Sequence, residues 1–204
     1  MITFDHIAVA GESLAAATSH VEVALNVPLQ QGGEHAVFHT HNTLLGLEDG
    51  LYLEAIAINP DAPVPNRARW FDLDRFAGAP RLTNWICRCA DLDATLAQLP
   101  EGFGAPVDLQ RGDLRWRMAV PLDGVLPYDN CAPALIQWIG DAHPAARLTQ
   151  QGCKMTALTV SHPQAGALAA LLAPLLHDAR ITFAQGAPKL TAQINTPEGT
   201  AVLC

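Results

Sequence analysis

TFDHIAVA, residues 3–10, and LYLEAIAI, residues 51–58, are the two stretches that decide the fold of this chain. Each reads as a short buried strand, and each carries one polar side chain that can bind a metal, His6 in the first and Glu54 in the second. A helical stretch and a histidine-rich loop lie between them. A histidine and a glutamate that face the same space from two buried strands suggest a metal site.

The composition is that of a globular protein. Of the 204 residues, 50% are hydrophobic and 16% are charged, which is too apolar for disorder and enough for one domain or two fused small ones. No apolar run reaches the roughly 20 residues of a membrane span, and the opening MITFDH lacks the basic segment of a secretion signal. The net charge of −8 argues against a nucleic-acid partner. Five cysteines without a CxxC pair indicate reduced thiols, so we expect a cytoplasmic protein with no membrane partner.

Three segments of the chain have a similar order of predicted elements. Residues 1–60 predict a strand, a helix and then two or three strands, and residues 80–145 predict the same order. Residues 152–204 predict a third, partial copy. In the first segment, apolar side chains recur at helical spacing over residues 14–25, and Asp49 followed by glycine supplies a hairpin turn.

Capping signals and linkers mark the borders of these segments. Asp91 is placed to cap the helix of the second segment, and Ser161, with Gln164 three residues later, predicts a capping box in the third. The proline-rich residues 59–70 form the first predicted linker, because clustered prolines cannot enter central strands. Residues 140–152 form the second.

Superimposing the segments on their helix starts matches several strand positions. His6, Asn84 and Ala157 fall at one position, and Glu54 and Gln137 match each other near the ends of the first two segments. Repetition of this kind favours a repeat fold more strongly than any single residue does.

These features resemble the vicinal oxygen chelate superfamily, and within it the glyoxalase-like domain proteins. The residues that carry the resemblance are FDHIAVA, GGEHAVFHTHN at 32–42, the strand with YLE, and the later RWRMAVP and LIQW. The resemblance implies an α+β fold of repeated βαβββ units that form curved mixed sheets, with a third partial unit packed into one compact protein. It also implies a metal-assisted lyase, isomerase or dioxygenase, with a small carbonyl, enediol or catechol-like substrate.

In that superfamily the metal ligands come from the first and last strands of two units, which implies His6, Glu54, Asn84 and Gln137 here. An imidazole and a carboxylate suit one divalent ion of Fe, Mn, Ni or Zn, whereas neutral amides bind such ions weakly. The resemblance therefore leaves three alternatives: a metal held weakly by His6 and Glu54, a loop histidine that completes the site, or no metal, with Glu54 hydrogen-bonded to His6. The loop histidines are His35, His39 and His41.

The same site offers groups for proton transfer and for anion binding. We expect His35 or His41, on a loop over the site, to move a proton, together with Glu54. Strand alternation puts Arg115 and Arg117 on one face, and we expect an arginine of residues 111–117, with Arg117 as the first choice, to bind an anionic small molecule. The other predicted substrate contacts are Asn84, Trp85, Arg88 and Gln137. In the alternative interpretation, these arginines form a solvated strand face with ion pairs to Asp108 or Asp113.

A metal-free function is the alternative to an enzyme. On the same fold, a pocket walled by Trp85, Trp116 and Trp138 would sequester an apolar ligand that carries an acidic group. The fold can also host a structural role, including that of a homodimer.

Overall fold

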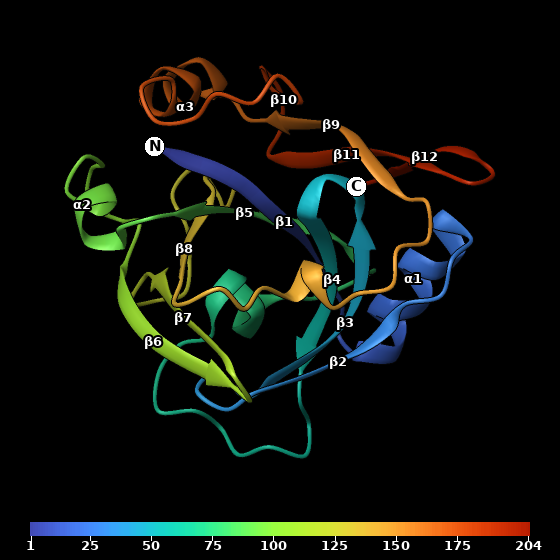
Figure 1. The fold of residues 1–204 in the computed structure, drawn as a ribbon. Helices are drawn as coiled ribbons and strands as arrows, with labels where there is room; N and C mark the ends of the chain where they lie inside the picture. Colours follow the sequence, from blue (N-terminus) through green and yellow to red (C-terminus); the bar gives the residue numbers. More distant parts are fainter.

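The computed structural model describes residues 1–204, and Figure 1 shows the order of their elements. The first segment contains β1 (Ile2–Ala10), α1 (Leu14–Leu25), β2 (Gln30–His35), β3 (Thr40–Leu47) and β4 (Leu51–Ile58). The second contains β5 (Arg81–Cys89), α2 (Leu92–Leu96), β6 (Ala105–Arg111), β7 (Leu114–Val120) and β8 (Ala134–Trp138). The third contains β9 (Lys154–Ser161), α3 (Ala165–Leu172), β10 (Ile181–Ala184), β11 (Lys189–Thr196) and β12 (Gly199–Leu203). Short 3-10 turns are η1 (Glu48–Gly50), η2 (Trp70–Arg75) and η3 (Pro144–Ala146).

The first two segments share one curled sheet of eight strands, in the order β2-β3-β4-β1-β5-β8-β7-β6. Within each segment the first strand pairs in parallel with the last, β1 with β4 and β5 with β8. The antiparallel pair β1–β5 then joins the two halves at the centre of the sheet. The sheet therefore forms a half-barrel with a concave inner face, which we call the cup (Figure 1). The predicted α+β fold with curved mixed sheets is confirmed.

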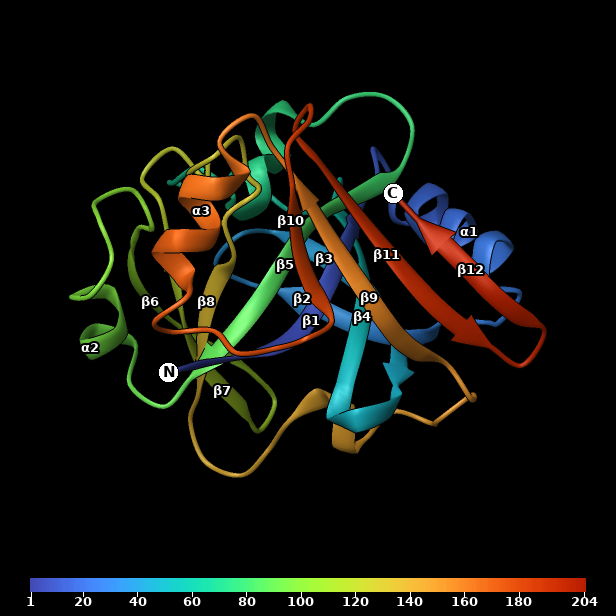
Figure 2. The same cartoon turned by 90° about the horizontal axis from the view of Figure 1, so that it is seen from above.

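The third segment forms a separate sheet of four strands, in the order β10-β9-β11-β12, which lies over the outer face of the first sheet (Figure 2). Its element order matches the other segments, but β9 pairs in parallel with β10 rather than with the last strand. This segment therefore repeats the order of elements without repeating the pairing that builds the cup.

Two apolar cores hold these layers together. The larger core fills the space between the two sheets and beneath α1, and it includes Phe4, Trp85, Leu158 and Ile194. The smaller core lies on the concave face and includes residues of η2, such as Trp70, together with side chains of β7 and β8. The centre of the concave face is therefore buried between β-strands and η2.

The structure confirms two of the predicted turn and cap signals and corrects a third. Asp91 Oδ1 accepts from Ala94 N at 2.9 Å, and Asp49 has a positive φ of 64° in the β3–β4 turn. The capping box at Ser161 is wrong, because Ser161 still pairs in β9 and α3 begins later without a side-chain cap. His162 Nδ1 instead accepts from Gln164 N at 2.9 Å.

Two bulk expectations can be compared with the structure. All five cysteines are free thiols, four of them buried. No helix has the length and apolarity needed to cross a membrane.

Candidate functional site

The candidate site lies where β1 and β4 run side by side in the cup. Their parallel register pairs His6 with Tyr52 and Ala8 with Glu54. Ile7 and Leu53 belong to the outer core, so alternation along each strand turns His6, Tyr52 and Glu54 toward the concave face. All three residues are buried, with His6 at 4%, Tyr52 at 5% and Glu54 at 5% exposure.

His6 and Glu54 approach each other inside a small cavity of about 30 Å³, which has room for about one water molecule. His6 Nε2 lies 3.6 Å from Glu54 Oε1. The Tyr52 ring stacks on the imidazole at 4.2 Å, and its hydroxyl lies 3.4 Å from His6 Nε2. The two side chains that the sequence singled out therefore meet across one cavity, as predicted.

Asp5 is a member of this site that the sequence analysis missed. A β-bulge interrupts the β1–β5 register between Phe4 and His6, and Asp5 is the extra residue. The bulge turns the Asp5 carboxylate to the same side as its neighbour, so His6 Nδ1 donates to Asp5 Oδ1 at 2.6 Å. This bond fixes the imidazole with its Nε2 atom facing Glu54. Simple strand alternation would have sent Asp5 to the opposite face.

The Asp5 carboxylate is fully buried and has further partners. Its Oδ2 atom accepts from Trp138 Nε1 at 3.2 Å and lies 3.1 Å from His143 Nε2. Arg88, a predicted substrate contact, has its Nη1 atom 3.7 Å from the same oxygen. Burial alone would raise the pKa of Asp5, but its bonds with His143 and His6 outweigh burial and lower that pKa.

The charges of His6 and Glu54 stabilise each other. Burial alone would lower the pKa of His6, but the carboxylates of Asp5 and Glu54 raise it to about 8. Burial alone would raise the pKa of Glu54, but His6 outweighs that effect and lowers it. Near neutral pH, without a metal, the cavity therefore holds an imidazolium ion between two carboxylates.

A second chain of hydrogen bonds orients Glu54 from the side opposite His6. Asn42 Nδ2 donates to Glu54 Oε2 at 2.8 Å, and Asn42 Oδ1 accepts from Arg111 Nη1 at 3.2 Å. Arg111 comes from the end of β6 and crosses to Gly33 of β2, where a Cβ would lie 2.9 Å from Arg111 Cδ. Gly33 therefore leaves the space through which this arginine reaches the cavity. An anion-binding arginine was predicted within 111–117, with Arg117 as the first choice, and the one at the cavity is Arg111.

His35, predicted to move a proton, does line the cavity. Its Nε2 atom lies 3.2 Å from Arg111 Nη1, which can only donate, so this nitrogen is the acceptor. Its Nδ1 atom then carries the hydrogen and bonds Thr40 Oγ1 at 2.9 Å. Burial, followed by the charge of Arg111, lowers the pKa of His35 to about 4 despite nearby Glu54. The imidazole is therefore neutral and both of its nitrogens are occupied.

The linker after β8 closes the cup, and Figure 1 shows it crossing in front of β4. Pro144 lines the cavity, and the His143 ring packs edge-on against Trp138 at 5.0 Å and Tyr52 at 5.7 Å. Trp70 and Trp116 complete the wall. We call residues 139–153 the strap, which contributes Pro144 to the wall of this cavity.

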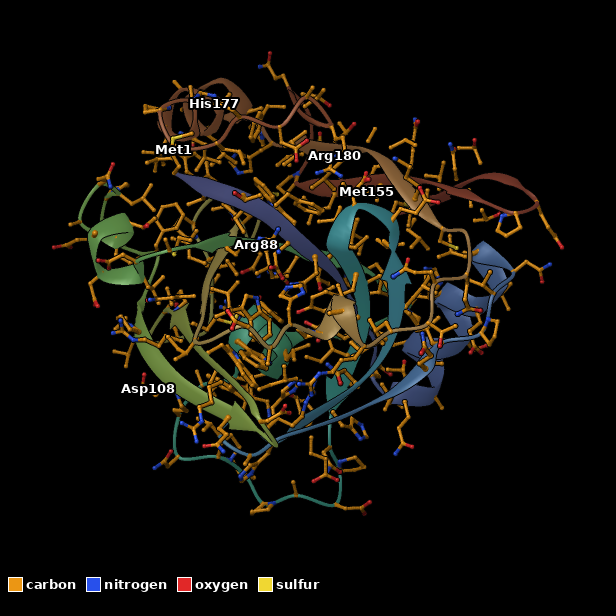
Figure 3. All side chains as sticks on the ribbon, viewed as in Figure 1. Met1, Arg88, Asp108, Met155, His177 and Arg180 are labelled. Atoms are coloured by element: carbon orange, nitrogen blue, oxygen red, sulfur yellow. The ribbon has the colours of Figure 1, made fainter.

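Several predicted site residues lie away from this cavity. Arg117 belongs to the outer face of β7 and pairs with Asp93 at 2.6 Å and Asp108 at 3.4 Å, the kind of ion pair foreseen in the alternative interpretation. Arg115 lies exposed on that face, and Figure 3 shows Asp108 at the outer edge beside β6. Trp85 is buried in the outer core, where its Nε1 donates to Cys131 O at 2.8 Å.

The remaining predicted residues are Gln137, His41, His39 and Asn84, and none of them lines the cavity. Gln137 lies on the outer face, where it accepts from Leu92 N at 3.1 Å and holds the start of α2. His41 alternates with the cavity residue Asn42 and so faces away from the cavity, while His39 bonds Pro63 O in the β2–β3 turn. Asn84 is fully buried, and neither of its amide atoms has a partner.

The donor chemistry fits a divalent ion with two protein ligands. Bonds of about 2.1 Å to an imidazole nitrogen and a carboxylate oxygen can meet at one ion when the donor atoms lie 3.6 Å apart, as His6 Nε2 and Glu54 Oε1 do. The Asp5–His6 bond is the support that metal-binding histidines usually have. No cluster of three or more histidine, cysteine, aspartate or glutamate side chains forms a metal site in the structure. Water or substrate oxygens would therefore have to supply the other ligands.

Comparison with known proteins supplies a family and a fold. A family model described as a glyoxalase-like domain matches residues 4–176. A hypothetical protein from Staphylococcus aureus superimposes with a TM-score of 0.66 at 14% identity, covering 93% of this chain and 88% of that one. Methylmalonyl-CoA epimerase from Mycobacterium tuberculosis superimposes with a TM-score of 0.43 at 20% identity, covering 70% of this chain and 91% of that one. The Streptomyces coelicolor methylmalonyl-CoA epimerase in complex with 2-nitronate-propionyl-CoA gives a TM-score of 0.44 at 15% identity, covering 70% of this chain and 100% of that one. No curated protein matches the chain.

Proposed function

The chain belongs to the glyoxalase-like domain family, and from this premise we propose that it is a metal-assisted enzyme for a small substrate with two adjacent oxygens. The observation that carries the proposal is the buried pair of His6 Nε2 and Glu54 Oε1, 3.6 Å apart, with Asp5 holding the imidazole in place. The substrate class is that of carbonyl, enediol or catechol-like compounds. A bound metal would act as a Lewis acid on the substrate oxygens.

Glu54 is the proton acceptor in this proposal. Its pKa is lowered, so the carboxylate is ionised near neutral pH. Asn42 holds Oε2 at 2.8 Å, which leaves Oε1 directed toward His6 and the cavity. Oε1 would thus either hold the metal or, when free of it, take a proton from a substrate carbon or hydroxyl beside it.

Tyr52 and Arg111 are the substrate-positioning groups. Burial raises the pKa of Tyr52 well above its usual value, so its hydroxyl keeps its hydrogen and can donate to a substrate oxygen. Arg111 brings a positive charge to the cavity wall and forms no ion pair of its own. We assign His35 to positioning Arg111 rather than to proton transfer, because its Nε2 atom accepts from that arginine at 3.2 Å.

A metal-free binding protein is the second candidate, and one observation favours it. The carboxylates of Asp5 and Glu54 raise the pKa of His6, so the imidazole is protonated near neutral pH. Its positive charge then partly neutralises the two negative charges. A buried ion pair of this kind is complete without a metal. In this case the cavity and its tryptophan walls would bind a small polar ligand after the strap moves.

Metal binding separates these two candidates. After treatment with a chelator, the full chain is titrated with Mn(II), Fe(II), Ni(II) and Zn(II) by calorimetry, with and without acetohydroxamate as a small ligand with two adjacent oxygens. We expect weak binding of the metal alone and tighter binding when the hydroxamate is present. His6→Gln and Glu54→Gln should each abolish this binding, because each removes one of two protein ligands.

The control variant is His41→Gln, which replaces a histidine on the opposite face of β3 and should leave metal binding unchanged. If no metal binds even with the hydroxamate present, the metal-free candidate replaces the enzyme. If the purified protein holds one metal ion per chain against a chelator, the site has more protein ligands than His6 and Glu54.

A further inference from the structure

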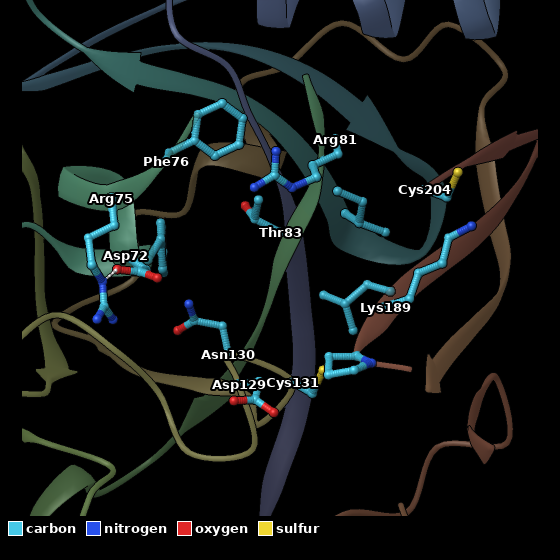
Figure 4. A pocket seen from close by; sticks show the side chains of 14 residues that line it. Asp72, Arg75, Phe76, Arg81, Thr83, Asp129, Asn130, Cys131, Lys189 and Cys204 are labelled. Atoms are coloured by element: carbon cyan, nitrogen blue, oxygen red, sulfur yellow. Dashed lines mark hydrogen bonds and ion pairs between the residues drawn. The ribbon is translucent and has the colours of Figure 1, made fainter. Parts of the chain in front are cut away.

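A second and larger cavity lies outside the cup, between η2, the start of β5, the 128–131 turn and the start of β11 (Figure 4). Its volume is about 500 Å³, which is in the range of sites for small organic ligands. Part of its lining is apolar and comes from separate parts of the chain. These apolar residues include Phe71, Phe76, Leu82 and Leu190. The cavity therefore has both the size and the apolar surface to hold the body of a ligand.

Two cations in this lining have no carboxylate partner. The Arg81 guanidinium packs over the Phe76 ring at 4.3 Å, and its Nη1 atom donates to the carbonyls of Ala77 at 3.0 Å and Ala79 at 3.3 Å. These contacts fix the group while leaving its Nε and Nη2 hydrogens unused. Lys189, at the first position of β11, also forms no ion pair.

The acidic side chains of the same lining already have hydrogen-bond partners, and one of them, Asp72, is paired with a cation. Asp72 binds Arg75 at 2.6 Å, and Asp129 binds His162 at 3.1 Å. Asn130 uses its Oδ1 atom to accept from Leu126 N at 2.7 Å, which leaves its Nδ2 group free to donate. The unpaired polar groups are thus mainly donors, two of them cationic, so the cavity is complementary to an anion.

The wall of this cavity is also held in an unusual backbone conformation. Phe71, Asp72, Asp129 and Asn130 all have left-handed φ values, of 60°, 56°, 52° and 64°. The two turns are tied to neighbouring chain, with Asp72 N donating to Gly124 O at 3.0 Å. Residues other than glycine keep such conformations where the surroundings enforce them, and these positions concentrate at ligand sites.

We propose that this cavity binds a small amphipathic anion, a carboxylate or phosphate monoester attached to an apolar chain or ring. Arg81 and Lys189 would bind the anionic group, and Phe76 and Leu190 would contact the apolar body. The site is separate from His6 and Glu54, so it stands whether or not the cup is an enzyme.

The test uses four probes titrated into the full chain by calorimetry: octanoate, octyl phosphate, octanol and inorganic phosphate. We expect one or both amphipathic anions to bind at one site per chain and octanol to bind at least about tenfold more weakly, because a charge-assisted hydrogen bond is lost. Inorganic phosphate should show no saturation, since it lacks the apolar body. The tighter of the two anions identifies the headgroup.

Variants then locate the binding site. Arg81→Gln and Lys189→Gln should each weaken anion binding about tenfold or more. Arg115→Gln is the matched control, an exposed arginine on β7 outside the cavity, and should leave affinity unchanged. Equal affinity for octanol and octanoate, no binding of either anion, or unchanged affinity in Lys189→Gln would overturn the proposal. If Arg81→Gln does not fold, Lys189→Gln and the octanol comparison still decide.

Discussion

At the scale of single residues, the β-bulge at Asp5 determines what the cup can do. Without the extra residue, alternation would point Asp5 into the outer core, where an unpaired carboxylate is costly. With the bulge, Asp5 and His6 face the same side and are joined by a bond of 2.6 Å. One inserted backbone residue thereby gives His6 both a fixed orientation and a raised pKa.

This arrangement predicts a pH dependence of stability in the metal-free protein. The folded pKa of His6 is about 8, against an ordinary value of 6.5, so its stabilisation is complete below pH 6.5 and is lost as the pH rises through 8. The difference corresponds to about 2 kcal/mol of unfolding free energy. Denaturant unfolding at pH 6 and pH 9 measures it.

Two variants identify the source of this pH dependence. In His6→Gln, the decrease in unfolding free energy from pH 6 to pH 9 should be smaller than in the wild type by about 2 kcal/mol. In His177→Gln, at an exposed histidine after α3, this decrease should equal that of the wild type. A wild-type loss that persists unchanged in His6→Gln would contradict the assigned pKa.

Some residues of the site can be predicted from the sequence and others cannot. His6 and Glu54 follow from strand alternation, and Tyr52 lies on the face that the same alternation gives to Glu54. Asp5 could not be predicted that way, because a bulge depends on the register with β5. Arg111 could be placed only within a range, since its approach to the cavity depends on the curvature that brings β6 beside β2.

At the scale of elements, one side chain links the two edge strands of the cup. Arg111, at the end of β6, reaches across Gly33 of β2 and donates to His35 Nε2 and Asn42 Oδ1, both at 3.2 Å. The outer edges of the first and second segments are thereby joined. The repeated order of elements predicts the fold class, but it does not predict the contact that Arg111 makes between β6 and β2.

Arg111→Ala should therefore destabilise the protein by about 1–3 kcal/mol, because it leaves the buried Nε2 atom of His35 without a donor, whereas Asn42 Oδ1 keeps the backbone N–H of Gly33 at 3.0 Å. Arg115→Ala, on the exposed outer face of the neighbouring strand, should change stability by less than about 0.5 kcal/mol. Denaturant unfolding of both variants beside the wild type makes the comparison. Equal effects would mean that Arg111 is a surface residue without a structural role.

At the scale of the whole molecule, the third segment is part of the main core rather than an attached module. Leu158 of β9 and Ile194 of β11 are fully buried in the same core as Phe4 and Trp85. The predicted order of elements does not show where this segment packs. Its strand β9 pairs with β10 rather than with a strand of the cup, and the sheet that they form lies over the outer face of the cup. A shared core predicts that the two sheets unfold together.

Tryptophan fluorescence can test that coupling, because all four tryptophans lie at or before residue 138, outside the third segment. Leu158→Ala removes a fully buried side chain of β9 and should cost about 2–5 kcal/mol. If the core is shared, the fluorescence transition should shift by the same amount as the transition in circular dichroism. Leu122→Ala, at a side chain that is 96% exposed, should shift neither. A fluorescence transition that stays in place while circular dichroism shows an earlier partial loss would mean that the second sheet unfolds on its own.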